Sequence, residues 1–138
     1  MSSGIEYVKK LRKSGLRPTK QRIKICEMLF NSTRTFHFTV NNLTKMLENN
    51  GNRKISLATI YNTIHAFEKK GYLKKISINS SQIYYDTNIS NHHHFFDEEK
   101  RELIDLENKD IEPIKIKKAI PGKKIKSIEV LVKVETDN

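Results

Sequence analysis

The stretch ISLATIYNTIHAFEKKGYL, residues 55–73, constrains the fold more than any other part of the chain, because it holds both ends of a helix. Ser56 is a favoured N-cap, and Gly71 is a typical C-terminal stop. Apolar residues recur between them at helical spacing, namely Leu57, Ile60, Ile64 and Phe67. Two short β-branched and aromatic runs follow, YLKKISI and QIYYDT, separated by NSS. This order predicts a helix that leads into a β-hairpin.

Two further capped helices precede this unit. RPTKQRIKICEMLFN has Pro18 for its first turn and Thr19 as a cap, and HFTVNNLTKMLENNG has Thr39 as a cap and stops at Asn50 and the glycine that follows. A shorter amphipathic helix is expected over Ile5–Lys13. Three short capped helices followed by a hairpin are typical of a winged helix, whose last helix enters the major groove of DNA.

Basic residues are concentrated in the first half of the chain. Residues 1–75 hold 16 Lys and Arg against 4 Asp and Glu, whereas residues 76–138 hold 10 against 12. This contrast indicates a polyanion-binding unit joined to a unit with another role. The charge alone does not distinguish DNA from RNA or from anionic lipid.

The single cysteine excludes several kinds of site. Cys26 has no partner for an internal disulfide, and a four-cysteine zinc site is impossible. Its neighbours Ile25 and Leu29 predict a buried, small apolar side chain. No apolar run is long enough to span a bilayer and no signal sequence opens the chain, so we expect a cytoplasmic protein with no membrane partner.

Three consecutive histidines begin the second half of the chain. Successive side chains of a strand point to opposite faces, so His92 and His94 are expected to share one face, ~6.5–7 Å apart, and His93 to take the other. HHHFFD and ELIDLEN predict a pair of strands around the turn EEKR, and KSIEVLVKVE predicts a third strand. The segment KDIEPIKIKKAIPGK between them predicts a short helix or an irregular crossover.

Residues 87–138 are too few to bury a self-sufficient core, so we expect this part to pack against a second copy. A homodimer also fits DNA binding, because two recognition helices can then address the two halves of a palindromic site.

Four motifs together resemble the ferric uptake regulator family, over roughly residues 15–134: GLRPTKQR, HFTVNNL, SLATIYNTIHAFEKKGYL and HHHFFDEEKRELIDL. The chain is most similar to the iron response regulator branch of that family. Three features carry this likeness: Asn62 after the tyrosine, HHHFF without a following cysteine pair, and the ending PGKKIKSIEVLVKV.

The resemblance implies an α+β protein. Residues 1–86 would form a winged-helix DNA-binding domain, and residues 87–138 a small C-terminal α/β domain for dimerisation and for sensing metal or haem. The implied function is a homodimeric transcription repressor that responds to iron or haem, binds AT-rich palindromic operator DNA and is not an enzyme.

The resemblance also implies particular DNA contacts. Tyr61 is expected to contact bases, and Asn62 is expected to change the operator preference because many relatives have arginine there. Basic residues of the first two helices would bind phosphates. The full set of residues expected to contact DNA is Lys9, Lys13, Arg17, Lys20, Ser56, Thr59, Tyr61, Asn62 and Thr63.

The implied regulatory metal site joins His37 and Asp86 to the pair His92 and His94. His37 would stand at the start of the third helix, and Asp86 at the end of the wing. Three imidazoles and one carboxylate suit Fe(II), Zn(II) or Mn(II).

Two other family sites are in doubt. The structural zinc site is absent, because Asp97 and Lys100 stand where its first cysteine pair would be. A second site on the opposite face of the strand would use His93 and Glu112, but its further histidine partner has no counterpart in this chain.

Haem is the other ligand that the resemblance implies, with His92, His93 and His94 as the candidate ligands. Phe95 and Phe96 would pack either on the porphyrin or in the core.

Several alternative functions stay open. The same scaffold could sense zinc, manganese or peroxide, since oxidisable Fe(II) permits peroxide chemistry. A small metal-dependent enzyme is disfavoured because no nucleophile–base pair emerges, and an architectural nucleic-acid binder would leave the histidines unexplained.

Overall fold

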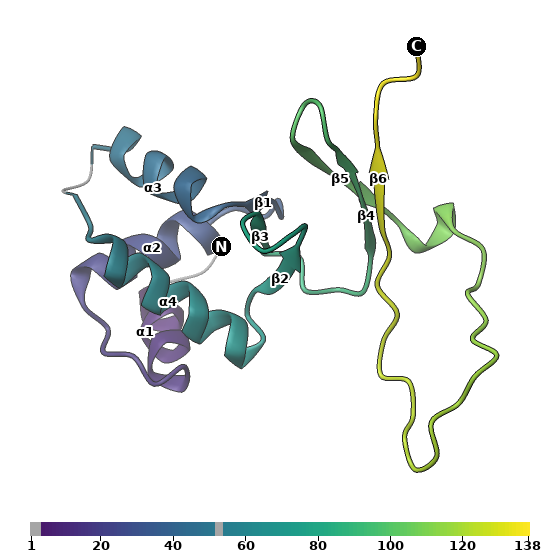
Figure 1. Ribbon diagram of the computed structural model, residues 1–138. Helices are drawn as coiled ribbons and strands as arrows, with labels where there is room; N and C mark the ends of the chain where they lie inside the picture. The colour runs from purple at the N-terminus through teal and green to yellow at the C-terminus, as the bar shows by residue number, and fades with distance from the viewer. Residues whose placement is uncertain (1–3, 52–53) are drawn as a thin grey trace. The chain divides into compact units, whose positions relative to one another are not determined.

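The computed structural model describes residues 4–51 and 54–138, which divide into two compact units (Figure 1). The N-terminal unit is Met1–Ile89 and the C-terminal unit is Ser90–Asn138, a division three residues after the expected boundary. Within the described residues, no helix is long and apolar enough to cross a membrane.

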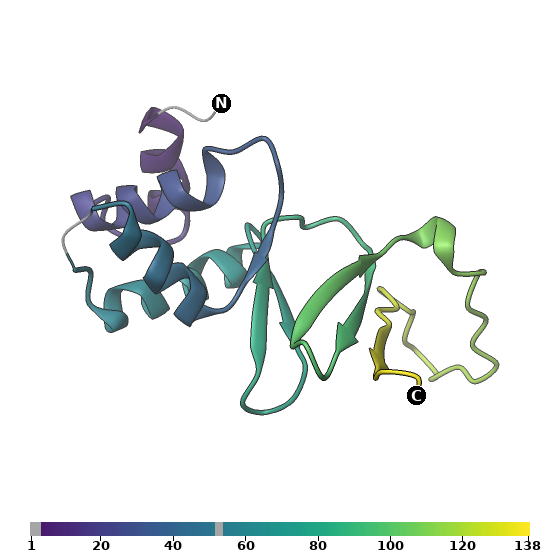
Figure 2. The same cartoon turned by 90° about the horizontal axis from the view of Figure 1, so that it is seen from above.

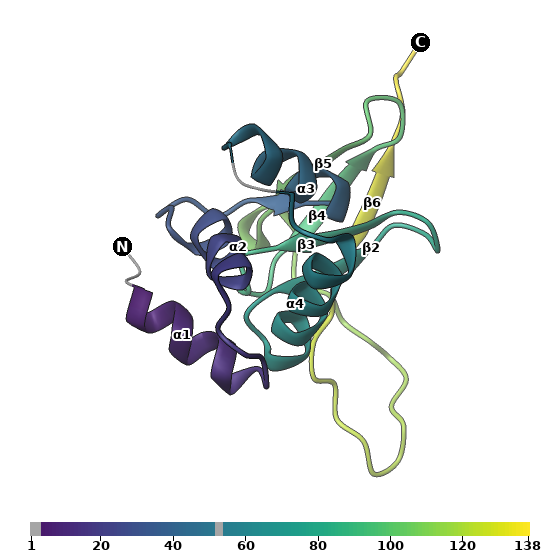
Figure 3. The same ribbon diagram turned by 90° about the vertical axis from the view of Figure 1, so that its left-hand side faces the viewer.

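Four helices form the body of the N-terminal unit, with α2 in contact with the other three (Figure 3). Their bounds are α1 Gly4–Lys13, α2 Lys20–Phe30, α3 Val40–Asn49 and α4 Leu57–Lys70. The apolar faces predicted from the helical spacing meet in one buried core, formed chiefly by Leu11, Ile25, Leu29, Leu43, Ile60, Ile64 and Phe67. Burial of these side chains is the main force that holds the short helices together.

The predicted N-caps are confirmed at Thr19, Thr39 and Ser56. Thr39 has the fullest arrangement, because its hydroxyl accepts from the Asn42 N–H at 3.1 Å while the Asn42 side chain accepts from the Thr39 N–H at 3.0 Å. Pro18 precedes the α2 cap instead of lying in the first turn as predicted. Gly71 ends α4 with φ +93°, a conformation that glycine adopts without strain.

A three-stranded antiparallel sheet completes the N-terminal unit. The predicted hairpin is β2 (Lys74–Ser77) and β3 (Ile83–Asp86), and β1 (His37–Phe38) joins the other side of β3. Because His37 lies in β1, the expectation that it starts the third helix is wrong by a few residues. The short strand is held by Phe38, which is buried and stacks on Tyr85 at 6.0 Å between ring centroids.

The C-terminal unit contains the three predicted strands, in the order β5-β4-β6 (Figure 2). β4 (His93–Asp97) pairs antiparallel with β5 (Glu102–Leu106) and parallel with β6 (Leu131–Val134), which is shorter than KSIEVLVKVE suggested. A 3-10 turn at Asn108–Asp110 follows β5. The described part of this unit contains no α-helix, so the crossover takes the irregular alternative.

The EEKR turn sets the register between β4 and β5. The Asp97 carboxylate accepts hydrogen bonds from the backbone N–H groups of Glu99 and Lys100, both at 3.0 Å. Arg101 completes the turn with a left-handed φ of 54°. The turn makes Asp97 the partner of Glu102, and counting back along the two strands brings Asp105 opposite His94.

Candidate metal centre and DNA-binding surface

Two histidines and one aspartate of the C-terminal unit converge as a group that could hold a metal ion. The Nε2 atoms of His92 and His94 lie 3.5 Å and 3.4 Å from the same carboxylate oxygen of Asp105. The two imidazole centroids are 4.4 Å apart, so the prediction that His92 and His94 share one face is confirmed. Both histidines are buried, whereas the Asp105 side chain is 49% exposed.

A backbone contact prepares His92 to bind a metal. Its Nδ1 lies 2.8 Å from the carbonyl oxygen of Ser90. A carbonyl can only accept, so Nδ1 carries a proton, and in the neutral imidazole Nε2 then presents its lone pair on the side of Asp105. Histidine ligands of metals commonly donate their second ring N–H to a carbonyl in this way, which fixes both the tautomer and the ring orientation.

The spacing of the ligand atoms also fits an ion between them. Separations of 3.4 Å and 3.5 Å are longer than a good N–H···O hydrogen bond. Two ligand atoms at ~2.1 Å from a tetrahedral ion would themselves lie ~3.4 Å apart. Imidazole nitrogen and carboxylate oxygen together suit Fe(II), Mn(II) or Zn(II). The residues present therefore fit a divalent transition metal.

Asp105 was not among the ligands expected from the sequence. It is one of 12 acidic residues in residues 76–138, and nothing in its local pattern distinguishes it. The sequence feature that could have identified Asp105 is the EEKR turn. A four-residue loop there pairs Asp97 with Glu102 and therefore His94 with Asp105. Counting that register would have placed this carboxylate beside the histidines.

The two other expected ligands meet in the N-terminal unit. His37 of β1 and Asp86 of β3 are cross-strand partners. Asp86 is at the end of the wing, as expected, and its carboxylate accepts the backbone N–H of Asn88 at 2.8 Å. An imidazole and a carboxylate thus lie side by side at the end of the unit's sheet.

His93 faces a different environment, which argues against the second metal site. Its Nδ1 accepts a hydrogen bond from the Val130 N–H at 2.9 Å. Neutral His93 then carries its proton on Nε2, so neither ring nitrogen presents a lone pair to a metal. His93 and Glu112 do line one cavity of about 280 Å³. The engaged ring is the physical reason why the pair His93 and Glu112 does not fit as a metal site.

The hydrogen bond between Val130 and His93 also affects the expected haem site. The Nδ1 of His93 accepts from the Val130 N–H, which weighs against a haem site built on all three histidines. Phe96 is 3% exposed and is the cross-strand partner of Leu103, which is also buried. Of the two alternatives, packing on a porphyrin or packing in the core, the burial of Phe96 favours the core.

A basic cavity of about 530 Å³ lies at the N-terminus of α2. It brings together three of the expected DNA contacts: Arg17 shortly before α2, Lys20 at the start of α2 and Thr59 on α4. Arg22, which sequence reasoning did not single out, also lines it. The Nη1 of Arg22 donates to the Arg17 carbonyl at 3.0 Å, while its buried Nε has no hydrogen-bond partner. The first N–H groups of a helix favour anions, so the cavity suits a phosphate.

The outer face of α4 carries the side chains expected to read bases. Tyr61 is 40% exposed and Asn62 is exposed, with His65 beside Tyr61 at 5.7 Å between ring centroids. Thr63 is different, because it is fully buried and its hydroxyl donates to the Thr59 carbonyl at 2.7 Å. The prediction that Thr63 contacts DNA is therefore wrong.

The remaining expected contacts are at the surface. Lys9 and Lys13 are exposed on α1. Ser56 is exposed as well, but its hydroxyl caps α4 by accepting from the Thr59 N–H at 3.2 Å, so its first role is structural.

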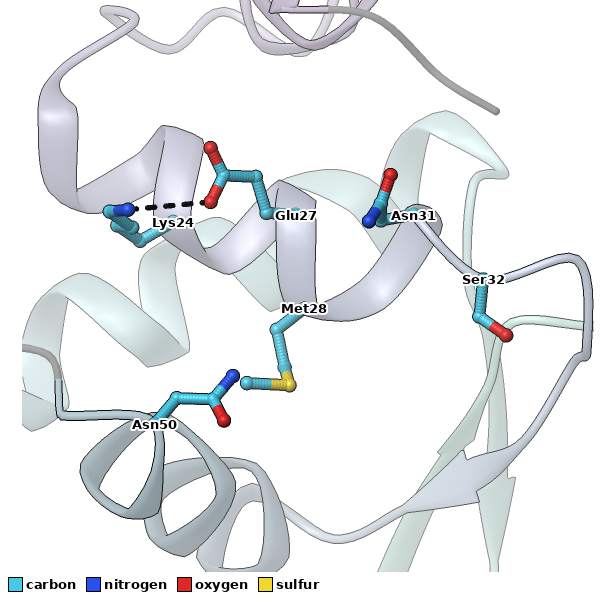
Figure 4. Close-up of a pocket in the computed structure, with 6 residues that line it drawn as sticks. All are labelled: Lys24, Glu27, Met28, Asn31, Ser32 and Asn50. Carbon is cyan, nitrogen blue, oxygen red and sulfur yellow. Dashed lines mark ion pairs between the residues drawn. The ribbon is translucent and has the colours of Figure 1, made fainter.

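Another cavity, of about 390 Å³, lies beside the C-terminal end of α2 (Figure 4). Its lining includes one carboxylate, Glu27, which is paired with Lys24 at 3.5 Å, and no imidazole. It contains none of the expected ligands and lacks the donors for a transition metal.

The family model described as "Ferric uptake regulator family" matches residues 13–133. The chain belongs to the ferric uptake regulator family. Members of this family are DNA-binding transcription regulators that act as dimers, and they are not enzymes. The disfavoured alternative of a small metal-dependent enzyme is thereby set aside.

Curated relatives of this family member are peroxide regulators. It is 31% identical over 102 residues to the peroxide-responsive repressor PerR of Staphylococcus aureus, covering 74% of this chain and 67% of that protein. It is 31% identical over 101 residues to the peroxide operon regulator of Bacillus subtilis, covering 73% and 68%. The matched region is thus about two thirds of each relative. These names do not support the iron response regulator branch.

The fold of this family member is also seen in a solved structure. The ferric uptake regulator from Pseudomonas aeruginosa with manganese superposes with a TM-score of 0.69 at 19% identity, covering 96% of this chain and 98% of that one. This likeness confirms the α+β fold with a winged-helix unit and a small second unit.

Proposed function

We propose that the chain is a transcription repressor whose affinity for operator DNA depends on a metal ion bound by His92, His94 and Asp105, and that Fe(II) at this site makes it responsive to peroxide. The observation that carries the proposal is the convergence of two imidazole nitrogens on one carboxylate oxygen, with the His92 tautomer set for metal binding. The curated relatives, which are named as peroxide regulators, support the choice of signal.

The lone thiol is a poor alternative sensor. Cys26 is fully buried in the core of the N-terminal unit, and burial raises its pKa to about 12. A thiol in that state forms little of the thiolate that reacts with peroxide. Bound Fe(II) would supply the electrons that reduce peroxide, whereas Zn(II) has no redox chemistry.

His37 and Asp86 are proposed as further ligands of the same ion. The support is their pairing in the sheet of the N-terminal unit and the short connection of five residues, 87–91, between Asp86 and His92. Metal binding would then link the end of the wing to the dimerisation unit. Such a link biases one arrangement of the two DNA-binding units over others, which is how a bound ion can change DNA affinity.

The proposed DNA target is an AT-rich palindrome bound by a homodimer. Tyr61 and Asn62 on the exposed face of α4 would read bases in the major groove. The cavity lined by Arg17, Lys20 and Arg22 would receive a backbone phosphate.

An iron- or haem-responsive regulator similar to the iron response branch is the second candidate. Its support is the HHHFF motif without a cysteine pair and the asparagine at position 62. The hydrogen bond from Val130 to His93 weighs against the haem version. A zinc or manganese regulator would use the same ligands as the peroxide version and differ only in the ion that is bound.

The test compares protein loaded anaerobically with Fe(II), Mn(II) or Zn(II). DNA affinity is measured by fluorescence anisotropy on a labelled AT-rich palindrome, before and after addition of peroxide. We expect each ion to strengthen binding and peroxide to release only the Fe(II)-loaded protein. The His92→Ala, His94→Ala double variant should show neither effect.

Haem is titrated into a parallel sample of metal-free protein. A stoichiometric Soret band accompanied by release of DNA would replace the peroxide proposal with the haem-responsive one. An equal peroxide response with Fe(II) and Zn(II) would contradict metal-based sensing.

A further inference from the structure

The crossover of the C-terminal unit is an unusually basic, fully exposed loop. All residues from 112 to 127 are exposed, and this stretch contains no helix or strand (Figures 1 and 2). Its tip is a tight turn, in which the Lys123 N–H donates to the Ile120 carbonyl at 3.0 Å and Gly122 has φ +76°. Loops of this length without secondary structure are uncommon in compact domains and are frequently functional.

Charge in the C-terminal unit is sharply segregated. Residues 113–128 contain six lysines and no acid. The rest of Ser90–Asn138 contains four basic and eleven acidic residues, a balance of −7. The lysines are Lys115, Lys117, Lys118, Lys123, Lys124 and Lys126. The structure, over the residues it describes, gives none of these six an ion pair, so acids of the same unit do not neutralise the loop.

A cluster of +6 on one exposed loop calls for a polyanionic partner. The loop has no aromatic residue, whereas proteins that bind single-stranded nucleic acids usually stack the bases on aromatic rings. Lysine is a flexible point charge suited to phosphate without base recognition. The phosphate backbone of duplex DNA fits these properties best.

We infer that the lysine-rich loop, residues 113–128, is a second DNA-contacting element that binds backbone phosphates independently of sequence. This inference rests on the proposed function as a DNA-binding regulator. It assigns the C-terminal unit a direct part in binding DNA, in addition to dimerisation and metal binding. The loop would add affinity and salt dependence, while α4 keeps the sequence specificity.

The test measures DNA affinity of the metal-loaded, full-length protein as a function of KCl concentration. The loop variant is Lys115→Gln, Lys117→Gln, Lys118→Gln. For each lysine–phosphate contact that is lost, the slope of log K against log salt should become less steep by about 0.9. The loss should be equal on an AT-rich palindrome and on a scrambled duplex.

The matched control removes three charges elsewhere in the same unit, with Lys100→Gln, Lys109→Gln, Lys133→Gln, all at exposed positions. Its slope should stay within error of the wild-type slope. An equal effect of both variants would overturn the inference, because general charge would then explain the loss. A wild-type slope in the loop variant would also overturn it, while leaving the proposed function intact.

Two further measurements distinguish DNA from other partners of the loop, and the DNA-binding results distinguish failure of this inference from failure of the proposed function. Sedimentation should give the same dimer mass for wild type and loop variant, and a monomeric variant would mean that the loop binds a second copy instead. Binding to phosphatidylglycerol vesicles that the loop variant alone loses, without any change in the DNA slope, would identify a membrane partner. Wild-type protein that binds neither duplex would refute both proposals, whereas binding without a metal response would refute only metal regulation.

Discussion

His94 and Asp105 are direct cross-strand partners in the β4–β5 pair, and the Nε2 of His94 lies 3.4 Å from the Asp105 carboxylate. This pairing makes Asp105, an acid with no distinguishing local pattern, a candidate ligand. We expect Asp105→Asn, which keeps the side-chain shape but removes the charge, to weaken Mn(II) binding by at least ~10-fold. Isothermal titration measures the change. Glu107→Gln removes an exposed acid two residues away and should leave Mn(II) affinity unchanged; equal losses in the two variants would argue against a ligand role for Asp105.

Asn62 and Thr63 are neighbours in sequence but should differ in their effect on DNA binding. Asn62 is exposed on α4, so Asn62→Ala should lower discrimination between the operator and a mismatched duplex by about 1–3 kcal/mol. Thr63 is fully buried, so Thr63→Val should leave DNA affinity unchanged apart from a small loss of stability. Competition binding with the two duplexes checks both. A specificity change in Thr63→Val would contradict the assignment of the faces of α4.

Arg22 is expected to contact phosphate from the cavity at the start of α2. Arg22→Gln should weaken binding to all duplex sequences alike and reduce the salt slope by about 1. Arg34→Gln, an exposed charge beyond the other end of α2, is the matched control and should change neither quantity. Loss of affinity for the operator alone would indicate base reading and not phosphate binding.

The Cys26 thiol should be inert in the native protein and should make stability fall at high pH. Burial raises its pKa from 9.0 to about 12, so between these values the unfolded chain loses the proton and the folded chain keeps it. The free energy of unfolding then falls by up to about 1.4 kcal/mol per pH unit above pH ~9, and is unaffected below it.

Urea unfolding of wild type and Cys26→Ala at pH 8 and pH 10 measures this effect. The difference between their free energies of unfolding cancels the contribution from lysines, which titrate in both proteins. The stability gap should change between the two pH values in the direction that disfavours wild type at pH 10. Rapid reaction of a thiol reagent with the folded protein at pH 8 would show that Cys26 is not protected by burial.

The capping box of α3 should contribute measurably to stability. Thr39→Ala removes the acceptor for the Asn42 N–H and should lower the free energy of unfolding by about 1 kcal/mol. Thr39→Ser keeps the hydroxyl and is the control. Chemical denaturation distinguishes the two, and equal stability of both variants would mean that water replaces the cap at no cost.

Local signals were sufficient for the helices of the N-terminal unit. Thr19, Thr39 and Ser56 as caps, with Gly71 as a stop, specify where helices begin and end because each satisfies backbone groups within a few residues. The two-residue strand β1 escaped prediction because it exists only through pairing with β3, which is distant in the chain. Thr63 was misplaced for a related reason: its polarity suggested the DNA face, but its hydroxyl is satisfied by the carbonyl four residues earlier.

By itself, the sequence determined the order of the helices and of every strand except β1, the basic character of the first half, and the sharing of one face by His92 and His94, because all three depend on residues close together in the chain. Only the tertiary structure decided that the Asp105 carboxylate lies within 3.5 Å of both imidazoles and that the His93 ring accepts a backbone hydrogen bond instead. The reason is that the register of β4 with β5 selects one carboxylate among many, and the Val130 N–H occupies the His93 ring. Tertiary pairing, and not local composition, therefore defines the candidate metal centre.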